Sequence, residues 1–420
     1  MAVFIKLLGG GGEIGRNAIE INYNNNSILL DYGVIFNSEI GFPLNVNLKK
    51  LIGIIISHTH LDHIGALPLI YSSSINPKIY FNSMTSELMN LLLLDFLKVS
   101  KGNLQFDETG ILKIFEKSSN VPFKYDFIIN DFSIKVGNAG HIPGSWIISV
   151  EVKNKKILYT GDFNVYDTKL LNGAEVIERN VDLLICESTY ACVNHIDRQK
   201  VEKLFIEKVL ETLENKGNVL IPSFAVGRSQ EILCILQKYN IKYPIFLDGM
   251  ARKASSIMLK YPEYFKDYNL LKSSHDLAIW VNNERERKRI LDEPSIIISP
   301  AGMLKGGPAL NYIKKIISDS RNSILFVGYL AENTPGREIL ESHTFTTETS
   351  KEKVKANVYW FGLSSHTDMK GIIDYIKEVN PQKVMFIHGE VERIIEMSKL
   401  IKNNYSIDII LGKTGESIEV

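Results

Sequence analysis

Residues Gly53–Gly65 of this 420-residue chain read GIIISHTHLDHIG. The apolar, β-branched run at the start of the stretch predicts a buried strand that ends where the polar residues begin. Four side chains that can bind a metal follow within six positions, namely His58, His60, Asp62 and His63. Imidazoles and a carboxylate without a thiolate suit zinc, with manganese as the alternative. A polar turn whose histidines cap a helix is the competing interpretation, and the clustering of three of the nine histidines favours a metal site.

Leu61 separates the pair His58 and His60 from the pair Asp62 and His63, which open the next predicted helix. The two pairs can therefore serve two different ions. The stretch also resembles the HxHxDH signature of the metallo-β-lactamase superfamily. That resemblance implies a sandwich of two mixed sheets flanked by helices, with metals at one sheet edge. It implies a hydrolytic site but no substrate, because this fold supports many chemistries.

Length and composition set broad limits on the class of protein. The length predicts two or three domains, each able to bury its own core. Hydrophobic residues make up 45% and charged residues 23% of the chain, as in an ordinary soluble globular protein. The formal net charge is zero, so charge gives no indication of a nucleic-acid-binding face. Cys186, Cys192 and Cys234 form no CxxC pair, which argues against a disulfide framework or a zinc knuckle.

Nothing in the sequence predicts export or membrane insertion. The N-terminal residues lack a basic region followed by a long apolar core, so we expect no signal peptide. The apolar runs are too short for a membrane span. We therefore expect a cytoplasmic protein with no membrane partner and no small-molecule cofactor.

Two further residues that can bind a metal end predicted strands. His141 lies in the turn Gly140–Ser145, where two glycines and a proline favour a rigid backbone suited to a fixed ligand. Asp162 follows the predicted strand Lys156–Thr160. In order and spacing they resemble the third and fourth motifs of the metallo-β-lactamase superfamily, which implies that both are metal ligands.

Two features near the N-terminus have alternative interpretations. Asp31 ends a predicted strand just before a glycine and locally reads as a turn aspartate. The superfamily has an aspartate at this place that orients ligand histidines, so the resemblance implies that role for Asp31. The run Gly9–Asn17, GGGGEIGRN, can bring backbone N–H groups against an anion or can be a permissive turn. Composition alone favours the turn.

The pattern changes to alternating strands and helices from about residue 191. The predicted strands are Asn218–Pro222, Pro244–Gly249, Ser295–Ser299 and Ser323–Tyr329. The predicted helices are Gln199–Lys216, Gln230–Tyr239, Ala251–Tyr261 and Leu310–Ser318. Such alternation predicts a parallel sheet with helices on both faces. We expect an inserted α/β domain at residues 191–356, and a first domain made of residues 1–190 and 357–420 whose β pattern resumes at Asn357–Phe361.

An α/β insertion ahead of the last metal histidine resembles the β-CASP group of nucleases. Glu187, after an apolar strand, matches motif A of that group. His366 within Ser364–Asp368 matches motif B, and His388 within Ile387–Glu390 matches motif C. The predicted fold is therefore a metallo-β-lactamase αββα sandwich with an inserted β-CASP domain.

The resemblance also implies how the ligands divide between two ions. Two zinc ions per chain are expected, with manganese as the alternative. One ion is assigned to His58, His60 and His141, the other to Asp62, His63 and His388, and the bridge to Asp162.

Phosphate-binding residues are expected in the inserted domain and beside motif B. Glycine-rich turns that open helices supply N–H groups and positive dipole ends. Arg228 and Arg337 can add charge-assisted contacts, although each arginine could instead pair with a carboxylate of the protein itself. The expected set is Ser223, Arg228, Arg337, Ser364 and Ser365.

Within the β-CASP group, a histidine at motif C is associated with RNA substrates. The resemblance therefore implies hydrolysis of RNA phosphodiester bonds by a two-metal mechanism. His366 is the expected general acid or transition-state stabiliser, oriented by Glu187, and a helix cap is its alternative role. Leu8–Asn17 is similar to ribonuclease J, a 5′→3′ exonuclease with some endonuclease activity. Ser223–Gln230 and Gly328-Tyr329 look at least as much like archaeal relatives of the cleavage and polyadenylation specificity factor nuclease.

We predict a 5′→3′ exoribonuclease that acts on single-stranded RNA in RNA processing or decay. An endoribonuclease of the cleavage and polyadenylation type is the alternative. A catalytically silent RNA-binding paralogue is disfavoured because none of the seven ligands is missing. A small-molecule hydrolase would leave the inserted domain unexplained. Whether the chain forms a homodimer stays open.

Overall fold

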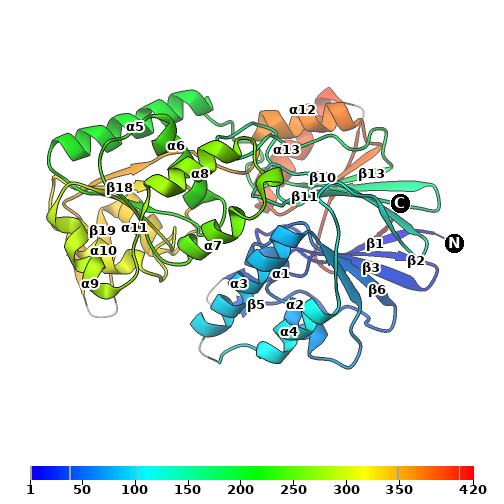
Figure 1. The fold of residues 1–420 in the computed structure, drawn as a ribbon. Helices are drawn as coiled ribbons and strands as arrows, with labels where there is room; N and C mark the ends of the chain where they lie inside the picture. The colour runs from blue at the N-terminus through cyan, green and yellow to red at the C-terminus, as the bar shows by residue number, and fades with distance from the viewer. Residues whose placement is uncertain (1, 37–38, 101, 348–349, 406) are drawn as a thin grey trace. The chain divides into compact units, whose positions relative to one another are not determined.

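The computed structural model describes residues 2–36, 39–100, 102–347, 350–405 and 407–420 (Figure 1). The chain divides into two compact units. The first consists of Met1–Asp167, Asn172–Asn194 and His366–Val420. The second consists of Thr168–Leu171 and His195–Ser365. Each unit has its own sheet structure and its own buried core.

The first unit contains two seven-stranded mixed sheets. The first sheet has the order β24 (Ser417–Glu419), β1 (Phe4–Gly9), β2 (Ala18–Tyr23), β3 (Asn26–Leu30), β6 (Leu51–Ile55), β7 (Lys78–Phe81) and β8 (Ser118–Asn120). The second has the order β23 (Asp408–Leu411), β22 (Lys383–Ile387), β13 (Leu183–Glu187), β12 (Lys155–Tyr159), β11 (Trp146–Val152), β10 (Phe132–Asn138) and β9 (Phe127–Ile129). A short hairpin of β4 (Ile35–Phe36) and β5 (Ile40–Gly41) lies outside both.

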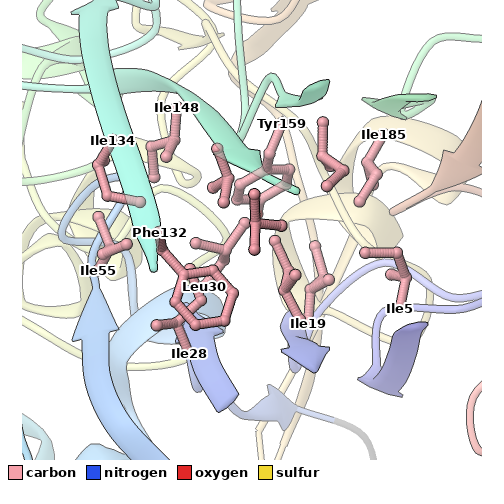
Figure 2. Packing of buried hydrophobic residues seen from close by; sticks show 14 of the residues in the cluster. Ile5, Ile19, Ile28, Leu30, Ile55, Phe132, Ile134, Ile148, Tyr159 and Ile185 are labelled. Atoms are coloured by element: carbon pink, nitrogen blue, oxygen red, sulfur yellow. The ribbon is translucent and has the colours of Figure 1, made fainter. Parts of the chain in front are cut away.

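Figure 2 shows how the inner faces of the two sheets form one core. Side chains two positions apart share a face of a strand, so the alternation in each strand aims one set inward. Ile19 and Ile28 from the first sheet face Ile134 and Ile148 from the second, and all four are fully buried. Burial of each such side chain contributes about 1.5–3 kcal/mol. This shared core holds the edges of both sheets in place.

Helices cover both sheets of the first unit (Figure 1). Beside the first sheet lie α1 (Leu61–Ile64), α2 (Leu67–Tyr71), α3 (Ser83–Val99) and α4 (Glu108–Glu116). Beside the second lie α12 (Met369–Val379) and α13 (Val391–Asn404). In α12 the residues Ile372, Tyr375, Ile376 and Val379 recur at helical spacing and pack into a core with the second sheet. The predicted αββα sandwich is confirmed.

The second unit contains a six-stranded sheet in which every pair of neighbours is parallel. Its order is β16 (Ile279–Trp280), β15 (Ile245–Leu247), β17 (Ile296–Ser299), β14 (Val219–Pro222), β18 (Ser323–Phe326) and β21 (Asn357–Trp360). Helices of this unit are α5 (Arg198–Glu214), α6 (Arg228–Lys238), α7 (Met250–Met258), α8 (Tyr268–Leu277), α9 (Glu284–Arg289), α10 (Ala309–Ile316) and α11 (Pro335–Ser342). The short elements are η1 (Pro262–Tyr264), η2 (Ile290–Asp292), β19 (Thr344–Thr346) and β20 (Lys351–Lys353).

Two separate cores flank the six-stranded sheet. Residues of α5 and α6 pack in one core, and residues of α10 and α11 pack in the other. Helices therefore cover both faces, which confirms the prediction of a parallel sheet between helical layers. Over the residues that the structure describes, none of the helices combines the length and apolar character needed to cross a bilayer.

The expectation that Asn357–Phe361 resumes the first domain's β pattern is wrong. β21 pairs with β18, from Ser323 opposite Asn357 to Phe326 opposite Trp360. The alternating pattern of these residues predicts a strand, but which sheet the strand joins depends on residues far away in the sequence. The second unit consequently extends to Ser365, and it also includes the short segment Thr168–Leu171.

Candidate metal centre and active site

The seven predicted metal ligands lie in the first unit, in turns and helix starts that follow strands. His58 and His60 follow β6, Asp62 and His63 belong to α1, and His388 follows β22. The other two occupy the turn between β10 and β11, at His141, and the end of β12, at Asp162. The strands β12, β13 and β22 are parallel neighbours, so the chain leaves all three at the same sheet edge.

The structure brings these seven side chains into two groups that share Asp162. In each group the candidate ligand atoms all lie within 4.8 Å of one another. The first group is His58, His60, His141 and Asp162, and the second is Asp62, His63, Asp162 and His388. These are the same two sets that the resemblance implies.

Asp162 is the centre of this arrangement. One carboxylate oxygen, Oδ2, lies 3.5 Å from His58 Nε2 and 3.7 Å from His141 Nε2. The other, Oδ1, lies 3.3 Å from His63 Nε2 and 3.4 Å from His388 Nδ1. Asp162 thus presents one oxygen to each group.

The donor atoms fit a divalent cation. Among the described residues, His58 Nε2 and Asp162 Oδ1 are buried and have no hydrogen-bond partner. Buried polar atoms are almost always paired. The unpaired His58 Nε2 in the first group and the unpaired Asp162 Oδ1, which faces the second group, therefore each call for an additional partner. Imidazole nitrogens and carboxylate oxygens without thiolate are the donors that zinc accepts in hydrolytic sites. The arrangement can therefore bind divalent metal.

Burial and charge set the protonation of the histidines. Burial lowers the pKa of His58 well below its ordinary value, and neighbouring His63 lowers it further. Burial likewise lowers the pKa of His60 to about 4. Burial lowers the pKa of His63 and His388 too, but the charge of Asp162 and of neighbouring carboxylates outweighs it, so both pKa values are raised. Neutral His58 and His60 keep the lone pair that a metal needs, and the carboxylates favour a cation at the second group.

Asp31 lies behind His63 and is fully buried. Its carboxylate accepts hydrogen bonds from the Ser57 backbone N–H (2.7 Å), the Ser57 hydroxyl (2.6 Å) and the Tyr159 hydroxyl (2.8 Å). His63 Nδ1 lies 2.7 Å from the same carboxylate. Because a carboxylate can only accept here, His63 donates from Nδ1 and directs Nε2 toward the second group. Asp31 lies where the predicted orienting role requires it.

Glu187 and His366 form a pair beside the first group. His366 Nδ1 lies 2.8 Å from Glu187 Oε1, and Glu187 also accepts hydrogen bonds from the backbone N–H groups of Phe163 and Thr189, each at 3.1 Å. The ring centroids of His366 and His141 are 4.5 Å apart. Burial lowers the pKa of His366, but the adjacent Glu187 charge and hydrogen bond outweigh it and raise the pKa to about 9.

The alternative role of His366 as a helix cap is wrong. The cap of α12 is Asp368, whose side chain accepts a hydrogen bond from the Gly371 backbone N–H at 2.9 Å. The cap position lies two residues after His366. The His366 imidazole instead contacts Glu187 and the ring of His141.

The five expected phosphate-binding residues belong to the second unit, where they have differing partners. Arg228 is buried and its Nη2 donates to the Ser365 hydroxyl. The Ser223 and Ser229 hydroxyls are 2.7 Å apart, and the Ser364 carbonyl accepts a hydrogen bond from another arginine. Arg337 pairs with Glu341 one turn along α11 at 2.5 Å, which is the carboxylate alternative. The structure thus brings Arg228 and Ser365 together, and gives Arg337 a partner of its own.

The glycine-rich run after β1 binds an anion supplied by the chain itself. Glu13 accepts a hydrogen bond from the Gly10 backbone N–H at 3.2 Å and a two-atom contact from Arg16, at 2.6 and 3.0 Å. The Gly11 N–H donates to the Thr414 hydroxyl at 3.2 Å. The run is therefore a turn in which one backbone N–H, that of Gly10, and the Arg16 guanidinium contact the carboxylate of Glu13.

Sequence reasoning missed several residues that support the ligands. Asn17 Nδ2 lies 3.0 Å from His63 Nε2, and the Thr189 hydroxyl lies 3.0 Å from His388 Nδ1. Ser57 and Tyr159 both donate to Asp31. Ser57 directly precedes the ligand motif and Asn17 ends the glycine-rich run, but position next to a motif does not reveal a contact. Tyr159 and Thr189 carry no local signal of this kind.

Gly33 allows the chain to pass directly against the ligand helix. A Cβ at Gly33 would lie 1.8 Å from the Asp62 backbone carbonyl oxygen and 2.4 Å from the His63 backbone nitrogen. We expect Gly33→Ala to destabilise the protein by roughly 1–3 kcal/mol and to lower its metal content, because Asp62 and His63 must shift. Chemical denaturation and elemental analysis of the purified protein measure the two effects.

Gly306→Ala provides the matched control for that variant, since a Cβ at Gly306 meets nothing within 4 Å. It should retain both stability and metal. Equal behaviour of the two variants would contradict the packing argument.

Comparisons with known proteins place three family matches along the chain. Residues 11–190 match the metallo-beta-lactamase superfamily, and residues 229–339 match the Beta-Casp domain. Residues 351–411 match the Zn-dependent metallo-hydrolase RNA specificity domain.

Similar proteins cover nearly the whole chain. An RNase named aCSPSF2 from Saccharolobus solfataricus is 38% identical over 100% of this chain and 86% of its own length. An RNase J-like protein from Methanocaldococcus jannaschii is 34% identical over 100% of both chains. A crystal structure of a protein of unknown function from Enterococcus faecalis V583 has a TM-score of 0.63 and 13% identity, with 100% of both chains covered. That likeness concerns the fold alone.

Proposed function

The chain belongs to the β-CASP group of the metallo-β-lactamase superfamily, and on that premise we propose that it is a metal-dependent ribonuclease. The observation that carries the proposal is the convergence of two ligand groups on Asp162, with the Glu187–His366 pair beside them. The names of the similar RNases from Saccharolobus solfataricus and Methanocaldococcus jannaschii support RNA as the substrate.

Each group of ligands is assigned one divalent ion, zinc or manganese. His58, His60 and His141 would hold the first ion, and Asp62, His63 and His388 would hold the second. Asp162 would contribute to both. Two such ions would stabilise the attacking and leaving oxygens in an in-line displacement at phosphorus.

The remaining residues act through proton position and orientation. Asp31 keeps the proton of His63 on Nδ1, so that Nε2 faces the second group. Glu187 holds the imidazole of His366 through Nδ1, so that the other ring nitrogen, Nε2, points away from Glu187. We assign His366 as the general acid that protonates the leaving oxygen of the RNA, or stabilises the charge that develops on it.

We assign contacts with the RNA backbone to the second unit. Arg228 and Ser365 are the first choice, because a buried arginine that donates to a serine hydroxyl is held in a defined position. Ser223 and Ser364 are secondary members. Arg337 is the weakest member, since its side chain is 42% exposed and its guanidinium is already paired with Glu341.

The preferred reaction is 5′→3′ removal of nucleotides from single-stranded RNA, with endonuclease cleavage as the alternative. End-labelled RNA that carries either a 5′-monophosphate or a 5′-triphosphate distinguishes them. An exonuclease that recognises the 5′-phosphate releases mononucleotides and prefers the monophosphate. Internal fragments produced equally from both substrates would instead support the endonuclease.

Removal of metal tests the proposal as a whole. We expect dialysis against a chelator to reduce RNA cleavage to background, because the ions supply several kcal/mol of transition-state stabilisation. Addition of Zn²⁺ or Mn²⁺ should restore cleavage, and the product length series should be the same before and after. Cleavage that persists in fully metal-free protein, as judged by elemental analysis, would contradict the proposal.

A further inference from the structure

Trp360 is an exposed indole at the end of β21, an edge strand of the six-stranded sheet, and none of the roles above uses it. The residue is 45% exposed. Every other aromatic residue that the structure describes in the second unit is buried or half-buried. Tryptophan is on average a strongly buried residue, so its exposure at this place is a feature of the surface to be explained.

The indole ring is fixed at two opposite edges. Its Nε1 donates a hydrogen bond to the Gly328 carbonyl at 3.0 Å. Its six-membered ring lies against Gly362, where a Cβ would be 3.3 Å from Cη2 and 3.6 Å from Cζ3. The N–H is the only polar group of the indole and is already paired, so the ring offers apolar surface to solvent. A ring held in this way loses little conformational freedom when a ligand binds to it.

Trp360 lies at the sheet edge to which RNA contacts were assigned above. The strands β14, β18 and β21 run parallel, and Trp360 is opposite Phe326 at the end of β18. Open α/β sheets bind ligands outside the carboxyl ends of their strands. Gly328, which accepts the indole hydrogen bond, lies against the ring of Phe224, because a Cβ there would be 3.3 Å from that ring. Phe224 directly follows Ser223, one of the expected phosphate-binding residues.

A nucleobase fits a single fixed ring better than a protein surface does. A stable protein interface needs about 800 Å² from each partner, whereas one aromatic side chain supplies about 150–250 Å². The other exposed large apolar residues described in the second unit lie outside β21 and outside the turns that follow β14 and β18, namely Ile196, Leu204, Leu277 and Ile279. Each base of an unpaired strand has a flat face that can stack on an exposed aromatic ring.

We propose that the exposed face of the Trp360 indole stacks on a base of single-stranded RNA bound at the carboxyl edge of the six-stranded sheet. The ring supplies affinity for bases without a preference for one sequence, because all four bases have such a face. Trp360 is thus a binding residue and not a catalytic one. The inference rests on the proposed function, since it takes the ligand to be RNA.

Binding of fluorophore-labelled single-stranded RNA, followed by anisotropy, tests this assignment apart from cleavage. The titrations use metal-loaded protein with His366→Ala as the common background, so that the RNA is preserved. We expect Trp360→Ala to raise the Kd roughly five- to 150-fold, as for loss of one stacked base. Trp360→Phe should recover most of the affinity, because a ring remains. An oligonucleotide of equal length built from abasic residues should bind equally to all three proteins, because it keeps the phosphates and lacks the bases.

Tryptophan emission gives a second measurement that does not require the alanine variant to fold. Stacking of a base should quench the emission of Trp360, and this part of the quenching should be absent from Trp360→Phe. Trp146 is fully buried and Trp280 is half-buried, and both remain in that variant as internal references. Leu204→Ala on α5 is the matched control, since it truncates a 50% exposed apolar residue of the same unit and should bind RNA as the background protein does.

Unchanged RNA affinity in Trp360→Ala would overturn the assignment, as would an equal loss of affinity for the abasic oligonucleotide. Weaker self-association of Trp360→Ala in light scattering, with RNA affinity unchanged, would assign the ring to a contact between two copies of the chain instead. Failure of the metal-loaded protein to bind RNA would overturn both this inference and the ribonuclease function. Binding that depends on Trp360, in a wild-type protein that cleaves no RNA, would support the stacking and refute the ribonuclease function alone.

Discussion

Asp162→Asn is expected to lower RNA cleavage by at least about 10³-fold and to lower the metal content of the purified protein. Asp162 is the one residue shared by both ligand groups, with one carboxylate oxygen toward each. An amide keeps the shape but loses the charge and one of the two oxygens. Because metal ions supply several kcal/mol of transition-state stabilisation and each 1.4 kcal/mol is a factor of ten, weakening both groups has a large effect.

The matched control for this variant is Asp182→Asn. Asp182 is another carboxylate of the first unit, which pairs with Lys155 at 2.7 Å and lies in neither ligand group. It should retain metal and cleavage, with at most a small change in stability. Full metal occupancy in Asp162→Asn, measured by elemental analysis with both samples treated alike, would contradict the shared-ligand assignment.

His366→Ala is expected to lower the rate of RNA cleavage by roughly 10²–10⁴-fold while the protein keeps its metal. His366 belongs to neither of the two groups assigned to metal, and its imidazole is instead held by Glu187 at 2.8 Å. Loss of a general acid should lower kcat, with little change in the affinity for RNA. Single-turnover kinetics with saturating enzyme measure the cleavage step directly.

His343→Asn is a suitable control, because it changes a histidine in the second unit to a residue that also tolerates the left-handed backbone there. It should cleave RNA at the wild-type rate. Glu187→Gln should reduce cleavage by a smaller factor than His366→Ala, since the imidazole remains but loses its charged partner. Near-normal turnover of His366→Ala would exclude His366 from the reaction.

The arrangement of the ligands could be anticipated from sequence to an unusual degree. His58, His60, Asp62 and His63 are close in the chain, and their side-chain chemistry alone indicates a metal. The resemblance adds His141, Asp162 and His388. Asp162 and His388 follow β12 and β22, which each run parallel to β13 and therefore end at the same edge of the sheet. The structure places all seven within two groups, as the order and spacing of the motifs imply.

Contacts between distant side chains could not be anticipated in the same way. Tyr159 and Asp31 are 128 positions apart, and Asn17 and His63 are 46 apart, yet each pair is in hydrogen-bond contact. Such contacts depend on how the strands and helices pack, which short-range patterns do not encode. The pair Arg337–Glu341 differs, because its members lie four positions apart on α11 and helix spacing alone brings them together.

The sequence by itself determined the alternation that builds a parallel sheet and the donor types of a metal centre, which follow from hydrophobic periodicity and side-chain chemistry, local properties of a chain. The αββα sandwich was expected from the resemblance of the ligand motif to the metallo-β-lactamase superfamily. Only the tertiary structure decided that β21 joins the sheet of the second unit and that Asn17 lies beside His63. Those outcomes depend on backbone pairing and packing between residues remote in sequence. Several local arrangements are equally favourable there, and only the contacts of the complete fold favour one of them.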